Sequence, residues 1–123
     1  MPDFRRASRI RQQVARLQVE RSTVEEALLH RRRMLAAGLI ARHLGTTEAK
    51  RASVAFYLSW ARAGRTRLVH VPKGRLGRVR GLTEAWREYR AALRRWRELT
   101  ARLDALWAEL GEAQAERPEG FHP

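Results

Sequence analysis

Seven cationic side chains fall within residues 61–80, a stretch that contains no Asp or Glu. They are Arg62, Arg65, Arg67, Lys73, Arg75, Arg78 and Arg80. Arginine carries a planar fork of donors that pairs with phosphate oxygens, and the same plane stacks on nucleobases. Cations at this density, without interleaved acids, differ from a surface held by ion pairs. We therefore expect residues 61–80 to contact an acidic partner.

The first part of this stretch has the composition of a charged strand with aromatic residues nearby. Arg65 and Arg67 are two residues apart, so they share one face of a strand, and Tyr57 and Trp60 precede them. Such a face can follow a phosphate backbone and stack bases. The alternative is an ordinary amphipathic hairpin with Phe56 and Trp60 in its core. We favour the core for the aromatic residues and phosphate contact for the arginines.

The second part is a basic segment in which glycine recurs between Lys73 and Arg80. Glycine lets the backbone approach a phosphate closely, and we expect the segment to lead into a helix N-terminus, where anions are favoured. The segment lacks the spacing of a P-loop, so nucleotide hydrolysis is not indicated. It is a candidate phosphate-contacting loop.

Two further arginine clusters lie in regions of helical pattern. Arg31, Arg32 and Arg33 fall inside the first such region, where they either meet acidic groups of a second helix or contact phosphate. Arg94 and Arg95 precede Trp96 in the second region, and we expect both to project to solvent as possible backbone contacts. All five arginines join the candidate nucleic-acid-binding set.

No arrangement of side chains in the sequence resembles a catalytic or metal site. The four histidines, His30, His43, His70 and His122, lack the spacing of metal ligands, and the chain contains no Cys. Ser53 and Ser59 have no recognisable His and Asp partners nearby. We therefore expect no catalytic residues, no metal and no cofactor, and a protein that is not an enzyme.

The composition is typical of a small, strongly basic soluble protein. It has 123 residues, 26 Lys and Arg against 13 Asp and Glu, and a formal net charge of +13. A GC-rich genome can explain the preference for Arg over Lys, but it does not explain the net charge, which favours an acidic partner. The longest apolar run, residues 34–41, is too short to span a membrane, and no signal-peptide pattern is present. The sequence thus predicts a soluble cytoplasmic protein without disulfides.

The positive charge is concentrated in the middle of the chain. Residues 1–60 carry 12 cations and 5 acids, a net +7, whereas residues 61–98 carry 12 and 3, a net +9. Residues 99–123 carry 2 cations and 5 acids, a net −3. We expect this acidic end to stay away from a phosphate backbone.

Hydrophobic periodicity predicts the first helix and a hairpin. Apolar residues recur at spacings of three, four and seven through residues 5–43. A capping-box pattern at 22–25 allows two helices there, but the register continues and favours one. Residues 53–71 alternate in polarity around a turn and predict a β-hairpin, with a helix over 47–62 as the alternative.

A basic loop over 72–82, with a short helical turn at 73–80 as an alternative, and a second helix over 83–116, with Thr83 as its candidate N-cap, complete the predicted order. One face of this helix repeats at steps of four and three, as in a coiled coil. That seam consists of Leu82, Trp86, Tyr89, Leu93, Trp96, Thr100, Leu103, Trp107 and Leu110. Residues 117–123 are expected to form a flexible tail. The predicted fold is mainly α with a small β-hairpin: one domain over 1–116, in which two long helices flank the hairpin and pack antiparallel or as a coiled coil.

The segments Tyr57-Leu58-Ser59-Trp60, Gly64-Arg65-Thr66-Arg67 and Val71-Pro72-Lys73 occur in a recognisable order. With Trp86 and Tyr89 they resemble a family of short prokaryotic proteins known only as a domain of unknown function and often encoded beside mobile elements. The resemblance covers residues 54–95. It departs at residues 40–53, which lack the Cys-rich knuckle of that family, so its metal binding is not carried over. The resemblance implies a helix–hairpin–helix module that serves a mobile element as a nucleic-acid-binding accessory.

Two functions follow as expectations. The first is a small non-enzymatic protein that binds DNA or RNA through phosphate contacts made by the arginine-rich hairpin and loop. The second is a helical subunit whose Trp/Leu seam docks on a larger protein, on a ribonucleoprotein or on a second copy of the chain.

Overall fold

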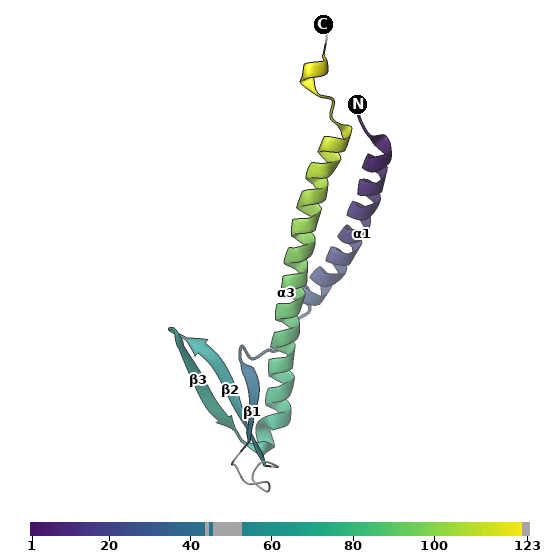
Figure 1. The fold of residues 1–123 in the computed structure, drawn as a ribbon. Helices are drawn as coiled ribbons and strands as arrows, with labels where there is room; N and C mark the ends of the chain where they lie inside the picture. Colours follow the sequence, from purple (N-terminus) through teal and green to yellow (C-terminus); the bar gives the residue numbers. More distant parts are fainter. Residues whose placement is uncertain (44, 46–52, 122–123) are drawn as a thin grey trace. The chain divides into compact units, whose positions relative to one another are not determined.

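The computed structural model describes residues 1–43, 45 and 53–121, and it is mainly helical, with two long helices and a three-stranded antiparallel sheet (Figure 1). The elements in chain order are α1 (Phe4–Leu29), β1 (Gly38–His43), β2 (Val54–Arg62), β3 (Arg65–Val71), α3 (Lys73–Gln114) and a 3₁₀ turn, η1 (Pro118–Gly120). The predicted mainly α class with a small β part is confirmed, but the β part is a three-stranded sheet and not the two-stranded hairpin alone.

The chain divides into two compact units, where the sequence predicted a single domain over residues 1–116. The helical unit comprises Met1–His30 and Ala92–Pro123, and the sheet unit comprises Arg31–Ala91. Helix α3 contributes its first half to the sheet unit and its second half to the helical unit. The two units are therefore interleaved along the sequence, since the helical unit is built from both ends of the chain.

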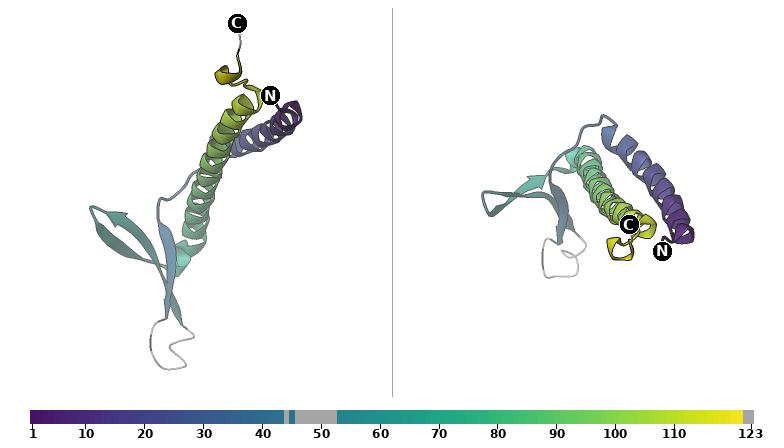
Figure 2. Two further views of the ribbon diagram at one scale, coloured as in Figure 1. Left: turned by 45° about the horizontal axis from the view of Figure 1, so that its top comes forward. Right: turned by 90° about the horizontal axis from the view of Figure 1, so that it is seen from above.

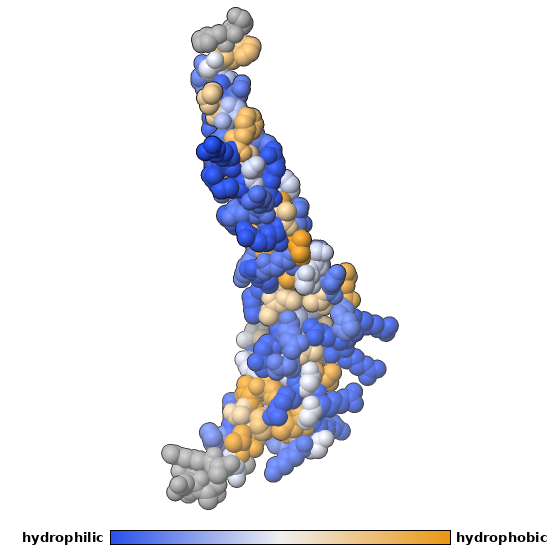
Figure 3. All heavy atoms as spheres, turned by 90° about the vertical axis from the view of Figure 1, so that its right-hand side faces the viewer, coloured by the Kyte–Doolittle hydropathy of each residue, from blue (hydrophilic) through white to orange (hydrophobic). Residues whose placement is uncertain are grey.

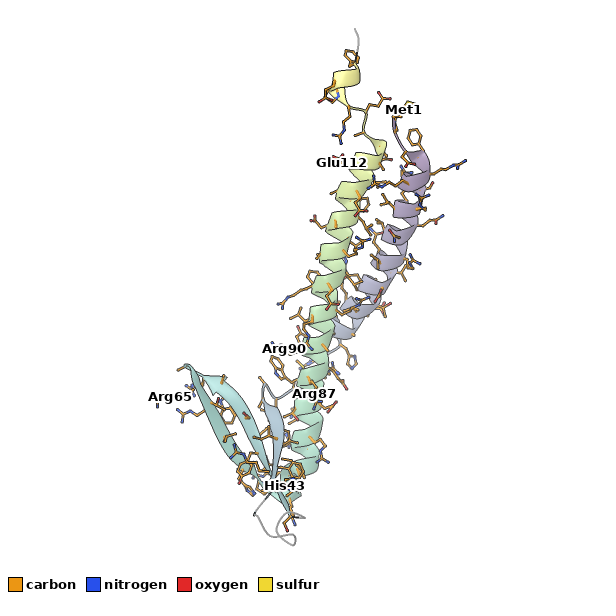
Figure 4. All side chains as sticks on the ribbon, viewed as in Figure 1. Met1, His43, Arg65, Arg87, Arg90 and Glu112 are labelled. Carbon is orange, nitrogen blue, oxygen red and sulfur yellow. The ribbon has the colours of Figure 1, made fainter. Side chains whose placement is uncertain are left out.

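The helical unit is held by an apolar cluster between α1 and the second half of α3. Ala7, Ile10 and Val14 of α1 are buried against side chains of α3, namely Leu103, Leu106, Leu110 and Ala113. The backbone amide of Asp3 donates a hydrogen bond to the carbonyl of Ala113 (2.7 Å), so the start of α1 meets the end of α3. The labelled residues Met1 and Glu112 accordingly lie at the same end of the pair (Figure 4).

The start of α1 is fixed by an N-cap. The Asp3 carboxylate accepts a hydrogen bond from the backbone amide of Arg6 (3.0 Å), which satisfies one of the free donors of the first turn. Farther along, the helix passes through the capping-box pattern at residues 22–25 without a break, and the Thr23 hydroxyl donates to the Val19 carbonyl (3.1 Å). The preference for an unbroken helix at this point is confirmed.

The prediction of helix as far as residue 43 is wrong. Helix α1 ends at Leu29, and Gly38–His43 instead form β1, which pairs antiparallel with the middle strand β2. Arg31, Arg32 and Arg33 consequently lie in the connection between α1 and β1, and Arg31 is not on a helical stripe. Pairing with β2 outweighs the helix-compatible composition of this segment, because strand formation depends on non-local partners.

The predicted hairpin at 53–71 is confirmed. Strands β2 and β3 pair antiparallel, with Arg62 opposite Arg65 next to the turn and Phe56 opposite Val71 at the other end. The two turn residues, Ala63 and Gly64, have φ of 52° and 76°. Positive φ at both central positions is the geometry that matches the twist of a tight hairpin. The alternative helix is wrong for residues 53–62, and its remaining residues, 47–52, lie outside the described part of the chain.

The predicted basic loop at 72–82 is also wrong, because α3 begins at Lys73. Thr83 is inside the helix, where its hydroxyl donates to the Arg80 carbonyl (3.2 Å), so it is not the N-cap. Proline 72 ends the strand and is compatible with the helix start that follows it. Leu76 and Val79 of this first part of α3 are half-buried, and their packing offsets the helix-weakening glycines around them.

The predicted seam of α3 agrees with the buried face of the helix over only part of its length. In the sheet unit Leu82, Trp86 and Tyr89 are half-buried, and in the helical unit Leu93 and Trp96 are half-buried. Nearer the C-terminus, Leu103 and Leu110 are buried as predicted, but Trp107 is 52% exposed. Leu106, with no exposed surface, occupies the core between Leu103 and Leu110 instead.

Most of the face of the molecule shown in Figure 3 is hydrophilic, and the hydrophobic residues on it lie in several separate patches. Within the described residues, neither α1 nor α3 has an apolar stretch that could cross a bilayer. After α3 the chain forms the short turn η1, whose residues are exposed, and Phe121 is 75% exposed.

Candidate nucleic-acid interface

The net charge of the protein is almost entirely in the sheet unit. Residues 31–91 contain 15 Lys and Arg against 3 Asp and Glu, a net +12. The two segments of the helical unit together contain 11 cations and 10 acids, a net +1. An acidic ligand attracted by the charge of this chain is therefore attracted to the sheet unit.

Three arginines of the sheet unit share one face of the β2–β3 hairpin. Because Arg62 is opposite Arg65 and Trp60 is opposite Arg67, the alternation of strand side chains places these four residues on the same face. All three arginines are exposed, and Trp60 is half-buried. The turn of the hairpin lies away from the rest of the sheet unit, with Arg65 next to it (Figures 2 and 4). The aromatic ring that accompanies the arginines on this face is thus Trp60, while Tyr57 is on the opposite face.

The remaining four cations of the stretch, Lys73, Arg75, Arg78 and Arg80, are exposed on the first turns of α3. The Arg80 guanidinium lies over the Phe56 ring, 5.3 Å from its centroid, and this contact joins α3 to β2. Within the described part of the chain, none of the seven cations of residues 61–80 forms an ion pair. Their charges are therefore available to an external anion.

The three arginines in the connection between α1 and β1 differ in their exposure and in their partners. Arg31 and Arg33 are exposed, but Arg32 is half-buried and donates to the Glu88 carboxylate (2.9 Å). The backbone amide of Leu35 also donates to the Leu82 carbonyl (3.1 Å). Arg32 thus helps to attach this connection to α3, whereas Arg31 and Arg33 stay open to solvent.

Arg94 and Arg95 belong to the helical unit. Arg94 is exposed, whereas Arg95 donates through Nε to the Glu20 carboxylate (2.9 Å) and through Nη1 to that of Glu98 (3.3 Å). The hydrogen bond that Arg95 donates to Glu20, followed by the one it donates to Glu98, raises the pKa of Arg95 above its already high usual value. The structure therefore assigns Arg95 to an ion-pair network that joins α1 and α3, which leaves its charge less available than that of the hairpin arginines.

The other face of the sheet carries a row of contacts across all three strands. The Arg42 guanidinium of β1 lies over the Tyr57 ring of β2, 5.7 Å from its centroid. The His70 ring of β3, opposite Tyr57, meets it edge-on, with centroids 5.5 Å apart. The sequence did not single out Arg42, because residues 38–43 were predicted to be helical, and only the pairing of β1 with β2 brings it beside Tyr57.

The described residues contain no group of three His, Cys, Asp or Glu side chains placed to hold a metal ion. A comparison with protein-family models, curated proteins and solved structures finds no match to this chain. The resemblance to the mobile-element family stays a prediction, and the function has to be argued from the charge and geometry of the sheet unit.

Proposed function

We propose that this chain is a small non-enzymatic nucleic-acid-binding protein that contacts the phosphate backbone through its sheet unit. The observation that carries the proposal is the set of seven cations in residues 61–80, which are exposed and form no ion pair within the described residues. They belong to a unit with a net charge of +12. An uncompensated charge of this size favours a polyanion, and Arg-rich surfaces suit phosphate oxygens in particular.

The geometry of the hairpin supports phosphate contact more than base readout. Arg62, Arg65 and Arg67 lie on one face of a two-stranded ribbon that extends from the sheet unit, so their side chains can follow successive phosphates. Contacts of this kind give affinity and orientation without sequence preference. The helical unit, with a net charge of +1, forms an antiparallel pair of α1 and α3 and acts as a scaffold that does not contact the ligand. In this proposal the protein accompanies a mobile element.

The test compares two double variants with the same change in charge. Arg65→Gln with Arg67→Gln removes two charges from the hairpin, and Arg5→Gln with Arg16→Gln removes two exposed charges from α1 of the helical unit. Affinity for labelled oligonucleotides is measured by fluorescence anisotropy over a series of salt concentrations. Each phosphate contact contributes about 0.7–0.9 to the slope of log K against log salt, so we expect the hairpin variant to lose about 1.4–1.8 of slope.

At about 0.1 M salt the loss of two such contacts corresponds to a decrease in affinity of roughly tenfold or more. The control variant should keep the wild-type slope, because its charges lie outside the sheet unit. Equal effects of the two double variants would show that only the total charge matters, and the assigned surface would then be wrong.

A second function is favoured by a groove in the helical unit. Leu28, Leu29, Leu93 and Trp96, with Glu25, line a hollow of about 280 Å³ between α1 and α3. Leu29, the last residue of α1, is 84% exposed, so part of this apolar lining is open to solvent. The alternative proposal is that this part of the Trp/Leu seam docks a larger protein, so that the chain serves as a subunit of a nucleoprotein assembly.

A further inference from the structure

Tyr57 is held at the centre of the sheet by neighbours on both sides. It lies on the middle strand β2, with the Arg42 guanidinium 5.7 Å from its ring centroid and the His70 ring edge-on at 5.5 Å. The three side chains come from three adjacent strands and form a row across the sheet. All three have planar, delocalised groups, which are the groups on which nucleobases stack.

The side chains of this row are largely open to solvent, and the described strands that carry them contain no acidic residue. Arg42 and His70 are exposed, Tyr57 is half-buried, and Leu68, two residues before His70 on the same face of β3, is 41% exposed. None of the three strands contains an Asp or Glu, while four arginines lie on them. A polyanion that approaches the Tyr57 face of the sheet therefore meets no carboxylate on a strand, whereas α3 packs on the opposite face through the contact of Arg80 with Phe56.

A ring on an open sheet face distinguishes between single-stranded and duplex ligands. The bases of a duplex already stack on one another and expose only their edges in the grooves. The bases of a single strand can turn outward and stack on a protein ring. We propose that the sheet unit binds single-stranded nucleic acid, with a base stacked on the Tyr57 ring in place of the exposed Arg42 guanidinium that lies over it; this inference rests on the proposed function and names its ligand class.

The two sheet faces then have different tasks. Strand β3 is one of the two outer strands of the described sheet, and Arg65 and Arg67 lie on its face opposite Tyr57 and His70. A flexible strand that passes along β3 places its phosphates near the arginines and turns a base over the edge towards Tyr57. A stiff duplex cannot follow this path with its bases paired.

The experiment uses the whole chain with four labelled probes of equal length: oligo-dT, oligo-rU, a duplex and an abasic single strand that keeps its phosphates. The variants are Tyr57→Leu, which removes the ring, and Tyr57→Phe, which retains it. We expect wild type to prefer the single strands with bases over the duplex and over the abasic strand. Tyr57→Leu should weaken single-strand binding roughly 5- to 100-fold, the range for one base–aromatic stack, and Tyr57→Phe should bind within about threefold of wild type.

The abasic probe separates stacking from charge. Tyr57→Leu should bind the abasic strand as wild type does and keep the wild-type salt slope, because it removes no phosphate contact. Should Tyr57→Leu fail to fold, the affinity of wild type for the base-bearing strand over the abasic one remains the measure. Equal wild-type affinity for these two probes, or a preference for duplex, overturns the inference.

The outcome for the proposed function is read separately. If Arg65→Gln with Arg67→Gln weakens binding and lowers its salt dependence while the bases make no difference, phosphate binding stands and the stacking site is wrong. Absence of binding to all four probes overturns both proposals.

Discussion

In the core of the helical unit, the sequence pattern and the structure disagree on which of two adjacent residues is buried. The heptad pattern of α3 places Trp107 in the seam, whereas the structure buries Leu106 completely and leaves Trp107 52% exposed. Leu106→Ala and Trp107→Ala change neighbouring positions in the same helix to the same residue. Their relative effects on the free energy of unfolding therefore report which side chain is in the core.

The expected magnitudes follow from burial. Leu106 packs among Ile10, Val14, Leu103 and Leu110, and truncation of a fully buried Leu costs about 2–5 kcal/mol through lost burial and the cavity that remains. Half of Trp107 is already in water, so its truncation loses about 1 kcal/mol of burial, which the better helix propensity of Ala reduces further. If Trp107 were in the core instead, its truncation would cost about 3–5 kcal/mol.

Urea unfolding followed by far-UV circular dichroism measures both variants against wild type. We expect Leu106→Ala to lower the unfolding midpoint clearly, because a domain of this size has only about 5–15 kcal/mol of stability, and Trp107→Ala to leave it nearly unchanged. The two variants can be compared if the dependence of their unfolding free energy on urea concentration has a similar slope. A larger loss for Trp107→Ala than for Leu106→Ala would refute the structural register of α3.

Two further predictions concern the turn and the groove. Gly64 has φ of 76°, and the position that a Cβ atom would occupy there is open space. Gly64→Val should therefore lower hairpin stability by about 1–2 kcal/mol through backbone strain alone, measured as faster amide hydrogen exchange in β2 and β3. Ala63→Gly should instead make amide exchange in these strands slower. If the groove docks a protein, the wild-type chain should co-purify with a partner from its native cells, and Leu29→Ser should weaken that association without changing oligonucleotide affinity. Equal recovery of the partner with both chains would contradict the alternative function.

The hairpin is the part of the fold that the sequence predicted best, because its signals are local. Residues 54–60 alternate in polarity, Gly64 supplies a turn, and Pro72 marks the end of the second strand. Each of these signals acts within a few residues, and all agree with one another. The antiparallel pairing of β2 with β3 could therefore be predicted without information from the rest of the chain.

Strand β1 could not be predicted in the same way, because what stabilises it is remote in sequence. Residues 31–37 are compatible with a helix, and the apolar spacing through Leu35 continues the pattern of α1. The strand forms because Leu39 and Ile40 find partners in Leu58 and Tyr57 of β2. Strand propensity is largely a matter of such neighbours, so a pattern read along one segment gives the wrong element here.

The candidate site was predicted in part, because its cations are local in sequence while its limits depend on the fold. Counted along the chain, the charge is +7, +9 and −3 for residues 1–60, 61–98 and 99–123. Counted by unit, it is +12 and +1, because the segment that contains β1 joins the hairpin while α1 pairs with the second half of α3. The carboxylates of the helical unit nearly equal its cations in number, and four of its described arginines form ion pairs, with Glu20, Glu25, Glu109 and Glu112 among their partners. Salt-dependent binding by this protein should therefore depend on the arginines of the sheet unit, even though 11 of the 26 cations lie outside it.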